Sequence, residues 1–246
     1  ILFERNFENP EQLIRLIDDL QSLAMSCPAS VPLFISVDQE GGRVARLKSP
    51  FSDFPQPSCL GQAQSESLAY RFGLALGREM KSVGINMVYA PVLDVNTNPA
   101  NPIIGTRALS DIPEWAGRMG KAVIAGIQEA GVFPVGKHFP GHGDTDRDSH
   151  LELPYVNRDT GSLEKVELEP FAQTVSHGLK VIMTAHVIYS AWDDKLPATF
   201  SPIILKSILR EKLGFDGLVI TDDLEMKAVE KNIPFESIPR LGSIAG

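Results

Sequence analysis

The sequence has little cysteine, no excess of positive charge and no long apolar run. Its two cysteines, Cys27 and Cys59, are too few for a disulfide scaffold or a zinc site built from cysteines. The formal net charge of −8 argues against nucleic-acid and anionic-membrane partners, because both need clustered Lys and Arg to neutralise phosphates. No stretch approaches the roughly 18 apolar residues that cross a bilayer, and no basic and apolar leader opens the chain. We therefore expect a cytoplasmic protein acting on a small, neutral or weakly charged substrate.

The composition is that of a globular protein with a sizeable core. Of the 246 residues, 43% are hydrophobic and 22% are charged. No internal repeat, charge block or low-complexity linker divides the chain, so we expect a single domain over residues 1–246. The opening "ILF" is typical of the middle of a strand, and the closing "IPRLGSIAG" has no terminating element. From these two features we expect the domain to be cut at both ends.

Short apolar, β-branched runs alternate with longer amphipathic segments along the chain. Asn9 and Pro10 are typical of a helix start, and Leu13, Leu16 and Ile17 lie on one face of the helix that follows. The remaining helices are expected at residues 66–83, 113–130, 170–178 and 202–213. Strands are expected at residues 1–3 (in part), 31–38, 85–92, 132–139, 181–187 and 217–223.

Alternation of strands and helices predicts a parallel α/β fold. The sequence has no glycine-rich nucleotide fingerprint, which favours a TIM-type (β/α)8 barrel over an open nucleotide-binding sheet. Polar clusters follow the predicted strands: "VDQEGGR", "PVLDVN", "KHFPGHGD", "AHVIYS" and "TDD". In a parallel barrel the carboxyl ends of the strands converge on one face. We expect these five clusters to share a cavity there.

The segment "KHFPGHGDTDRDSH", residues 137–150, is the densest of these clusters, and a metal site is one interpretation. His138 and His142 are four residues apart, but Pro140, Gly141 and Gly143 disfavour a helix, so the pair would not share one helix face as in helices that bind zinc. A loop site with oxygen ligands stays open.

A phosphate-binding loop is a weaker interpretation of the same segment. Gly141 and Gly143 could present backbone N–H groups, but Asp144, Asp146 and Asp148 would repel an anion.

Acid/base chemistry is the third interpretation. Asp148 and His150 are separated by one residue, so in an extended chain their side chains point to the same side and can form a hydrogen bond. That bond would fix the tautomer of the imidazole and favour its protonated form near neutral pH. The alternative is a solvated loop histidine beside a surface aspartate.

Two carboxylates end the last predicted strand. The period-2 pleat would send Asp222 and Asp223 to opposite sides, so only one of them would face the cavity. Asp222, kept ionised by Lys137, Arg107 or Arg46, could serve as a nucleophile or general base. Either aspartate could instead cap the helix expected after it.

Six motifs together resemble the bacterial β-N-acetylhexosaminidases of glycoside hydrolase family 3. They are "VDQEGGRVARL", "APVLDVN", "IGTRAL", "KHFPGHGDTDRDSH", "AHVIYS" and "GFDGLVITDDLEMKA", in order over nearly the whole chain. The resemblance implies the N-terminal-type catalytic barrel of that family, with a strand before "ILF" and another after "SIAG".

The resemblance also implies roles for particular residues. Asp222 matches the nucleophile that forms a covalent glycosyl intermediate, and His150 matches the general acid/base with Asp148 as its dyad partner. The residues that match those holding the N-acetylglucosamine ring are Asp38, Arg46, Arg107, Lys137 and His138.

The predicted activity is retaining hydrolysis of terminal β-linked N-acetylglucosamine, without a metal or an organic cofactor. By resemblance the substrate is a muropeptide or disaccharide from recycled peptidoglycan, and the protein is a monomer. Three rivals stay open: a phosphorylase that uses phosphate as acceptor, a metal-dependent hydrolase and a non-catalytic sugar-binding module.

Overall fold

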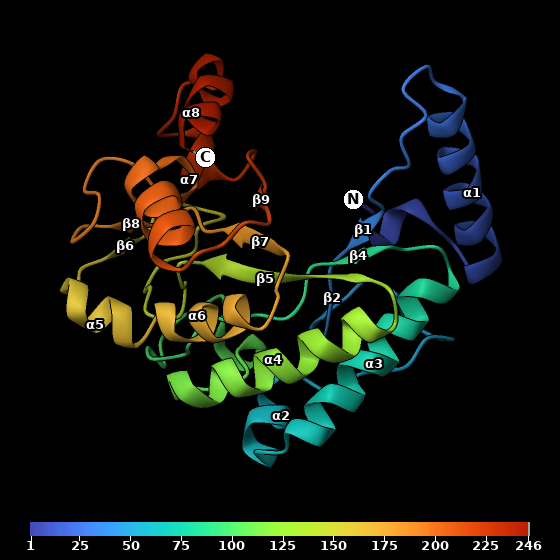
Figure 1. Ribbon diagram of the computed structural model, residues 1–246, viewed down its shortest axis with the longest axis horizontal. Coiled ribbons are helices and arrows are strands. Elements are labelled where there is room, and N and C mark those ends of the chain that lie inside the picture. The colour runs from blue at the N-terminus through green and yellow to red at the C-terminus, as the bar shows by residue number, and fades with distance from the viewer. Residues whose placement is uncertain (246) are drawn as a thin grey trace.

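A curled, all-parallel sheet forms the centre of the molecule (Figure 1). The computed structural model describes residues 1–245. The sheet has five strands in the order β1 (Ser36–Val37), β4 (Met87–Val88), β5 (Phe133–Phe139), β7 (Val181–Thr184) and β9 (Leu218–Thr221). Leu2 extends it by a parallel bridge to Val37. The order of these strands in the sheet is the same as their order along the chain, as in a β/α barrel. The predicted fold class is therefore confirmed.

Helices lie around this sheet, with the longer ones between successive strands on its outer face (Figure 1). They are α1 (Pro10–Ser26), α2 (Ser58–Ala63), α3 (Glu66–Ser82), α4 (Pro113–Glu129), α5 (Thr160–Lys165), α6 (Leu168–Ser176), η4 (Ile203–Lys212), α7 (Lys227–Glu230) and α8 (Ile238–Ala245). Asn9 caps α1 as predicted, since its side chain accepts a hydrogen bond of 2.9 Å from the Gln12 amide. The five predicted helices are present with ends shifted by up to a few residues. None of the helices in residues 1–245 combines the length and the apolar character needed to span a bilayer.

Short elements join these layers. Single-turn 3₁₀ helices lie at η1 (Glu4–Asn6), η2 (Gly105–Arg107), η3 (Ala198–Phe200) and η5 (Phe235–Ser237). Two small ribbons lie outside the main sheet: β2 (Gln39–Gly41) pairs with β3 (Val44–Ala45), and β6 (Tyr155–Val156) pairs with β8 (Ile188–Tyr189). These short elements were not predicted.

The strands expected at 31–38 and 85–92 are much shorter in the structure, where only Ser36–Val37 and Met87–Val88 are regular. The strand expected at 31–38 is regular only at Ser36–Val37, because side chains bond the backbone before it. Asn86 accepts from the Ile35 amide at 2.7 Å and donates to the Leu33 carbonyl at 2.9 Å. An amide side chain thus replaces the ladder there.

Side chains inside the curl form two layers. Met87, Val135, Val181 and Met183 pack into one apolar cluster on the inner face. Lys137 follows Val135 by two residues on β5 and therefore projects to the same face, nearer the carboxyl end. The inner face is therefore apolar toward the amino ends of the strands and charged toward their carboxyl ends.

Candidate active site

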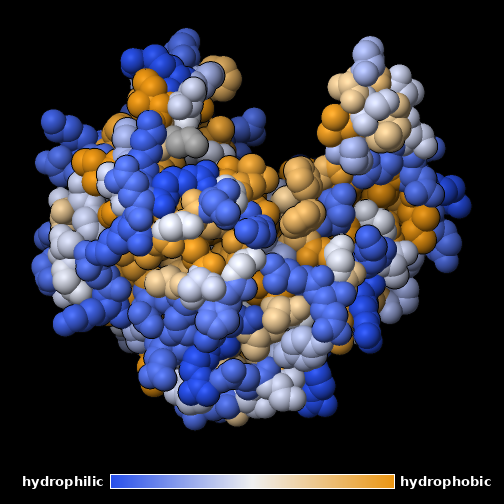
Figure 2. Space-filling view, in the orientation of Figure 1, coloured by the Kyte–Doolittle hydropathy of each residue, from blue (hydrophilic) through white to orange (hydrophobic). Residues whose placement is uncertain are grey.

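A cleft of about 800 Å³ opens at the carboxyl ends of the strands. All the residues predicted for the site line it except Asp148. Its lining also includes Ile1, Phe3 and Arg5 from one end of the chain and Asp222 to Met226 from the other. Figure 2 shows the surface hollowed between the part that carries α8 and the part that carries α1. Three of the five predicted clusters, "VDQEGGR", "KHFPGHGD" and "TDD", therefore share one cavity, whereas no residue of "PVLDVN" or "AHVIYS" lines it.

Paired charges form the floor of the cleft. The Lys137 ammonium is buried and lies 2.9 Å from Asp38 Oδ1 and 2.7 Å from Glu40 Oε1. Arg107 donates two hydrogen bonds of 2.8 Å to the Glu40 carboxylate. Arg46 approaches Asp38 more loosely, at 3.6 Å. These contacts hold the cations in fixed positions around a buried carboxylate.

Glu40 is the anion at the centre of this floor. Burial alone would raise its pKa, but the charges and hydrogen bonds of Lys137 and Arg107 lower it to about 2. For Lys137 the signs are reversed: burial lowers the pKa, while Glu40 and Asp38 raise it above its usual value. Glu40 and Lys137 are therefore both charged at neutral pH.

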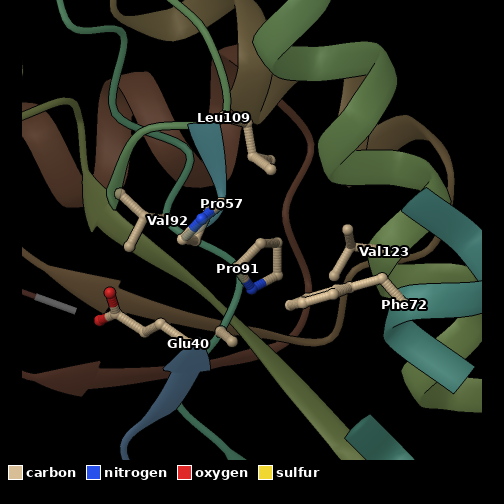
Figure 3. Close-up of a pocket in the computed structure, with 8 residues that line it drawn as sticks. Glu40, Pro57, Phe72, Pro91, Val92, Leu109 and Val123 are labelled. Atoms are coloured by element: carbon tan, nitrogen blue, oxygen red, sulfur yellow. The ribbon is translucent and has the colours of Figure 1, made fainter. Parts of the chain in front are cut away.

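Behind Glu40 the wall is apolar (Figure 3). A cavity of about 10 Å³ lies there, and the other residues that line it are Pro57, Phe72, Ala90, Pro91, Val92, Leu109 and Val123. A space of this size holds at most about one water molecule. The Glu40 carboxylate thus depends on Lys137 and Arg107 for its partners.

Asp94 anchors the turn that follows β5. Its Oδ1 accepts from the amides of His138 at 3.0 Å and His142 at 2.7 Å, and its Oδ2 lies 2.7 Å from His138 Nδ1. Asp94 is fully buried, and burial would raise its pKa, but the two imidazoles and the His142 amide lower it below its usual value. An ionised Asp94 requires a proton on His138 Nδ1, so His138 presents Nε2 to the cleft.

Asp222 lies just after β9, at the cleft. Burial raises its pKa, but the His138 and His186 imidazoles, the Asp223 amide and Lys137 together lower it below its usual value. The Asp223 amide donates to Asp222 Oδ1 at 2.8 Å. The carboxylate is therefore ionised at neutral pH, as a nucleophile or base requires.

The structure corrects two expectations for the end of β9. The strand ends at Thr221, so the pleat does not separate Asp222 from Asp223, and both line the cleft. Helix α7 begins only at Lys227 and has no side-chain cap, so neither aspartate caps it. Asp223 Oδ1 instead accepts from the Glu225 amide at 2.9 Å, within the turn before α7.

His150 and Asp148 form the hydrogen bond that their spacing predicts. Asp148 Oδ1 lies 2.8 Å from His150 Nδ1 and accepts from the His150 amide at 2.8 Å. The segment is a turn rather than an extended chain, since the Leu151 amide donates to the Asp148 carbonyl. The His150 side chain is 62% exposed and lines the cleft, with Asp148 behind it. The ring thus presents Nε2 outward.

The histidines of "KHFPGHG" do not converge on a common point. The His138 and His142 ring centroids are 6.0 Å apart. His142 Nδ1 lies 2.8 Å from Thr145 Oγ1 and its Nε2 lies 3.1 Å from Ser149 Oγ, and burial lowers the pKa of His142 to about 4. Within residues 1–245 no three His, Cys, Asp or Glu side chains are grouped so that they could hold a metal ion.

Three residues of the site were not singled out from the sequence. Glu40 and Asp94 lie inside the motifs "VDQEGGR" and "PVLDVN", but only their buried contacts identify them as anchors. His186, in "AHVIYS", is buried and donates from Nε2 to the Asp223 carbonyl at 3.0 Å. Sequence position could have indicated all three, because each belongs to a polar segment at the carboxyl end of a predicted strand.

The comparisons with known proteins agree with this geometry. Residues 1–241 match the model of the glycosyl hydrolase family 3 N terminal domain. A β-hexosaminidase from Alkalilimnicola ehrlichii is 41% identical over 252 residues, which cover 100% of this chain and 70% of that protein. A β-hexosaminidase A from Pseudoalteromonas piscicida is 39% identical over 93% of this chain and 41% of its own length.

Solved structures give the same result. A family 3 β-N-acetylglucosaminidase from Paenibacillus sp. FPU-7 superposes with a TM-score of 0.97 and 42% identity, over 100% of this chain and 47% of that one. NagZ from Neisseria gonorrhoeae, in complex with N-trifluoroacetyl-D-glucosamine, gives a TM-score of 0.89 and 37% identity, over 100% and 70%. The chain thus spans 41% to 70% of the lengths of these four relatives.

Charged and imidazole groups gathered over the carboxyl ends of parallel strands define the class: a β/α-barrel enzyme. Within that class, the chain belongs to glycosyl hydrolase family 3, because its residues 1–241 match the N-terminal domain of that family.

Proposed function

We propose that the protein releases terminal β-linked N-acetylglucosamine by retaining hydrolysis, with Asp222 as the nucleophile and His150 as the general acid/base. One observation carries the proposal: Asp222 and His150 come from different elements and line the same cleft. A carboxylate and a proton donor on one sugar-sized cavity are the two groups that a retaining glycosidase needs. The general scheme uses two carboxyl groups, and here an imidazole replaces one.

In the first step, a carboxylate oxygen of Asp222 forms a bond to the anomeric carbon. The bond from that carbon to the departing oxygen breaks, and His150 Nε2 gives its proton to that oxygen. Asp148 holds the other ring nitrogen at 2.8 Å, which fixes the orientation of the ring and directs Nε2 to the substrate. In the second step, neutral His150 takes a proton from water, whose oxygen attacks the anomeric carbon and frees Asp222.

The floor of the cleft supplies the sugar-binding groups in this proposal. Asp38 and His138 present an acceptor and a ring nitrogen for hydroxyl groups, and Lys137 and Arg107 offset the charges of the Asp38 and Glu40 carboxylates. Arg46 lies at the more exposed side, where its loose contact with Asp38 leaves hydrogen-bond donors for a ligand. All five act by holding the ring in place while Asp222 attacks.

The names of the relatives support the substrate class. They include β-hexosaminidases and β-N-acetylglucosaminidases at about 40% identity. Because the chain spans only part of most of these proteins, the activity is proposed for the whole protein that contains this domain. N-acetylglucosamine linked to a muramic-type sugar, from recycled peptidoglycan, is the substrate that we propose. A cytoplasmic setting and a monomeric state stay predictions from the sequence.

Substitution of Asp222 and His150 tests the proposal. Asp222→Ala should lower turnover of aryl β-N-acetylglucosaminides by at least about 1000-fold, because the covalent step loses its nucleophile. Asp216→Ala is the control, since Asp216 is exposed and makes one long contact of 3.3 Å with Lys180. Near wild-type turnover by Asp222→Ala with the fold intact would refute the assignment.

For His150→Ala the expected loss depends on the leaving group. It should be about 100-fold or more for poor leaving groups, which need protonation, and small for good ones. Equal losses across a series of leaving groups would count against the acid role.

Product analysis separates the rival activities. Glycosyl phosphate formed in the presence of phosphate would favour a phosphorylase, and loss of activity in a chelator would favour a metal-dependent hydrolase. Sugar binding without turnover would favour the third rival, a non-catalytic sugar-binding module.

A further inference from the structure

Glu167 is a buried carboxyl group that the proposed reaction does not use. It immediately precedes α6, where its side chain caps no helix amide. The residue is 1% exposed, and neither carboxyl oxygen has a hydrogen-bond partner among the described residues. A buried ionised carboxylate normally has such partners, because desolvation without them is costly. An unpartnered carboxyl group therefore favours the neutral, protonated form.

The side chain packs under the turn that leads into the His150 segment. A Cβ placed on Gly141 would lie 2.8 Å from both Cβ and Cγ of Glu167, so the two residues are in direct contact. Gly141 has φ +143°, and its carbonyl accepts the Tyr189 hydroxyl. The next residue, His142, is held by Asp94. Glu167 thus packs against the turn that connects His138 to the segment carrying His150.

The charges around Glu167 oppose its ionisation. Burial raises its pKa most, Asp144 and Asp94 raise it further, and Arg158 opposes them, with a resulting pKa of about 7. Arg158 is already engaged, since its Nε donates to Asp144 Oδ2 at 2.7 Å. The other titratable group beside Gly141 is the Tyr189 hydroxyl, whose pKa burial raises well above its usual value. No free cation therefore faces Glu167 from the loop, from β8 or from the segment after β4.

We propose that Glu167 is a positioning residue of the active site: its protonated carboxyl group supports the Gly141 turn, and its ionisation loosens the segment from Gly141 to Arg158 that carries Asp148 and His150. An ionised Glu167 must gain donors, either from water or by drawing Arg158 away from Asp144. Both changes release an anchor of that segment, since the Asp144–Arg158 pair closes its far side. The effect on activity rests on the proposed function; the effect on the segment does not.

The pH profile of isosteric variants tests this role. The substrate is an aryl β-N-acetylglucosaminide with a very good leaving group, for which kcat/KM does not depend on the proton of His150. Wild-type kcat/KM should fall about tenfold from its plateau to pH 8, because a pKa of about 7 leaves about a tenth of Glu167 protonated there. Glu167→Gln and Glu167→Met cannot ionise and should fall less than twofold.

Glu169→Gln is the matched control, because Glu169 lies on the same helix and bonds Gln173 at 2.8 Å. This variant should keep the wild-type alkaline limb. If both variants at Glu167 also keep that limb, the inference is wrong.

Hydrogen exchange of peptides from 141–158 gives a readout that needs no activity. After correction for the intrinsic rate, protection in the wild type should fall between pH 6 and pH 8 and stay constant in Glu167→Gln. If the wild type does not turn over the substrate, the proposed function fails and this measurement alone decides the role of Glu167. Wild-type protection that does not change between these pH values would overturn it, whether or not the variants fold.

Discussion

Glu40→Gln is the most informative single perturbation of the cleft floor. The substitution keeps the size of the side chain and removes its charge. Lys137 would retain only Asp38 as an anionic partner, and Arg107 would lose its two hydrogen bonds of 2.8 Å to a carboxylate. A buried guanidinium without an anion is costly, so the folded state should lose stability and the cleft should lose its geometry.

The magnitude follows from the pKa of Glu40. A shift from 4.5 to about 2 corresponds to about 3 kcal/mol of stabilisation by the ionised form at neutral pH. Because the pKa is lowered in the folded state, this stability is fully present above the unfolded pKa of 4.5 and is lost as the pH falls through 2. At pH 3 about 1 kcal/mol should remain.

Chemical denaturation of wild type and variant at pH 7 and pH 3 measures this difference. Glu66→Gln is the matched control, since Glu66 pairs with Arg118 at the surface and its loss should cost under about 1 kcal/mol at either pH. A Glu40→Gln penalty as small as that of Glu66→Gln at pH 7, or one that does not shrink at pH 3, would refute the reasoning. In the intact enzyme we also expect a higher KM.

Three further predictions concern the same face of the barrel. Asp94→Asn replaces an acceptor oxygen by an amide, so it should cost about 1–3 kcal/mol in denaturation and lower kcat/KM about 100-fold by misplacing the turn that it holds. Because the pKa of Asp222 is lowered, Asp222 loses its charge only as the pH falls below its usual 3.8, and an acid limb of kcat/KM centred near pH 5 in the folded enzyme would contradict its role. Gly143→Ala would bring a Cβ within 1.7 Å of a backbone carbonyl oxygen and should lower Tm by several degrees, whereas Gly242→Ala, with no neighbour within 4 Å, should not.

The fold class was predictable because its signals are local. Apolar periodicity, helix-start residues such as Asn9 and the glycines after helices act within a few residues, and the order of the elements then implies the parallel sheet. Strand lengths were not predictable. The side chain of Asn86 bonds the backbone of residues 33–35 across the sheet, and that contact spans more than 50 residues.

The sequence predicted which residues form the site better than it predicted their geometry. Strand-end position and resemblance together identified the residues that line the cleft, such as Lys137 and Asp222. Local spacing could not show that β9 ends one residue before Asp222, because strand ends depend on pairing with β7. Nor could it show that Glu40 and Asp94 anchor their neighbours, since a buried carboxylate is recognised only by what surrounds it.

The order of the strands has a consequence for synthesis on the ribosome. Every strand of the sheet pairs with one already made, so a nascent chain can add each β/α unit to a growing wall without waiting for later sequence. The ion cluster around Glu40 can form once Lys137 has emerged, well before Asp222 is translated. The carboxylate proposed as nucleophile would then dock onto a platform that is already assembled.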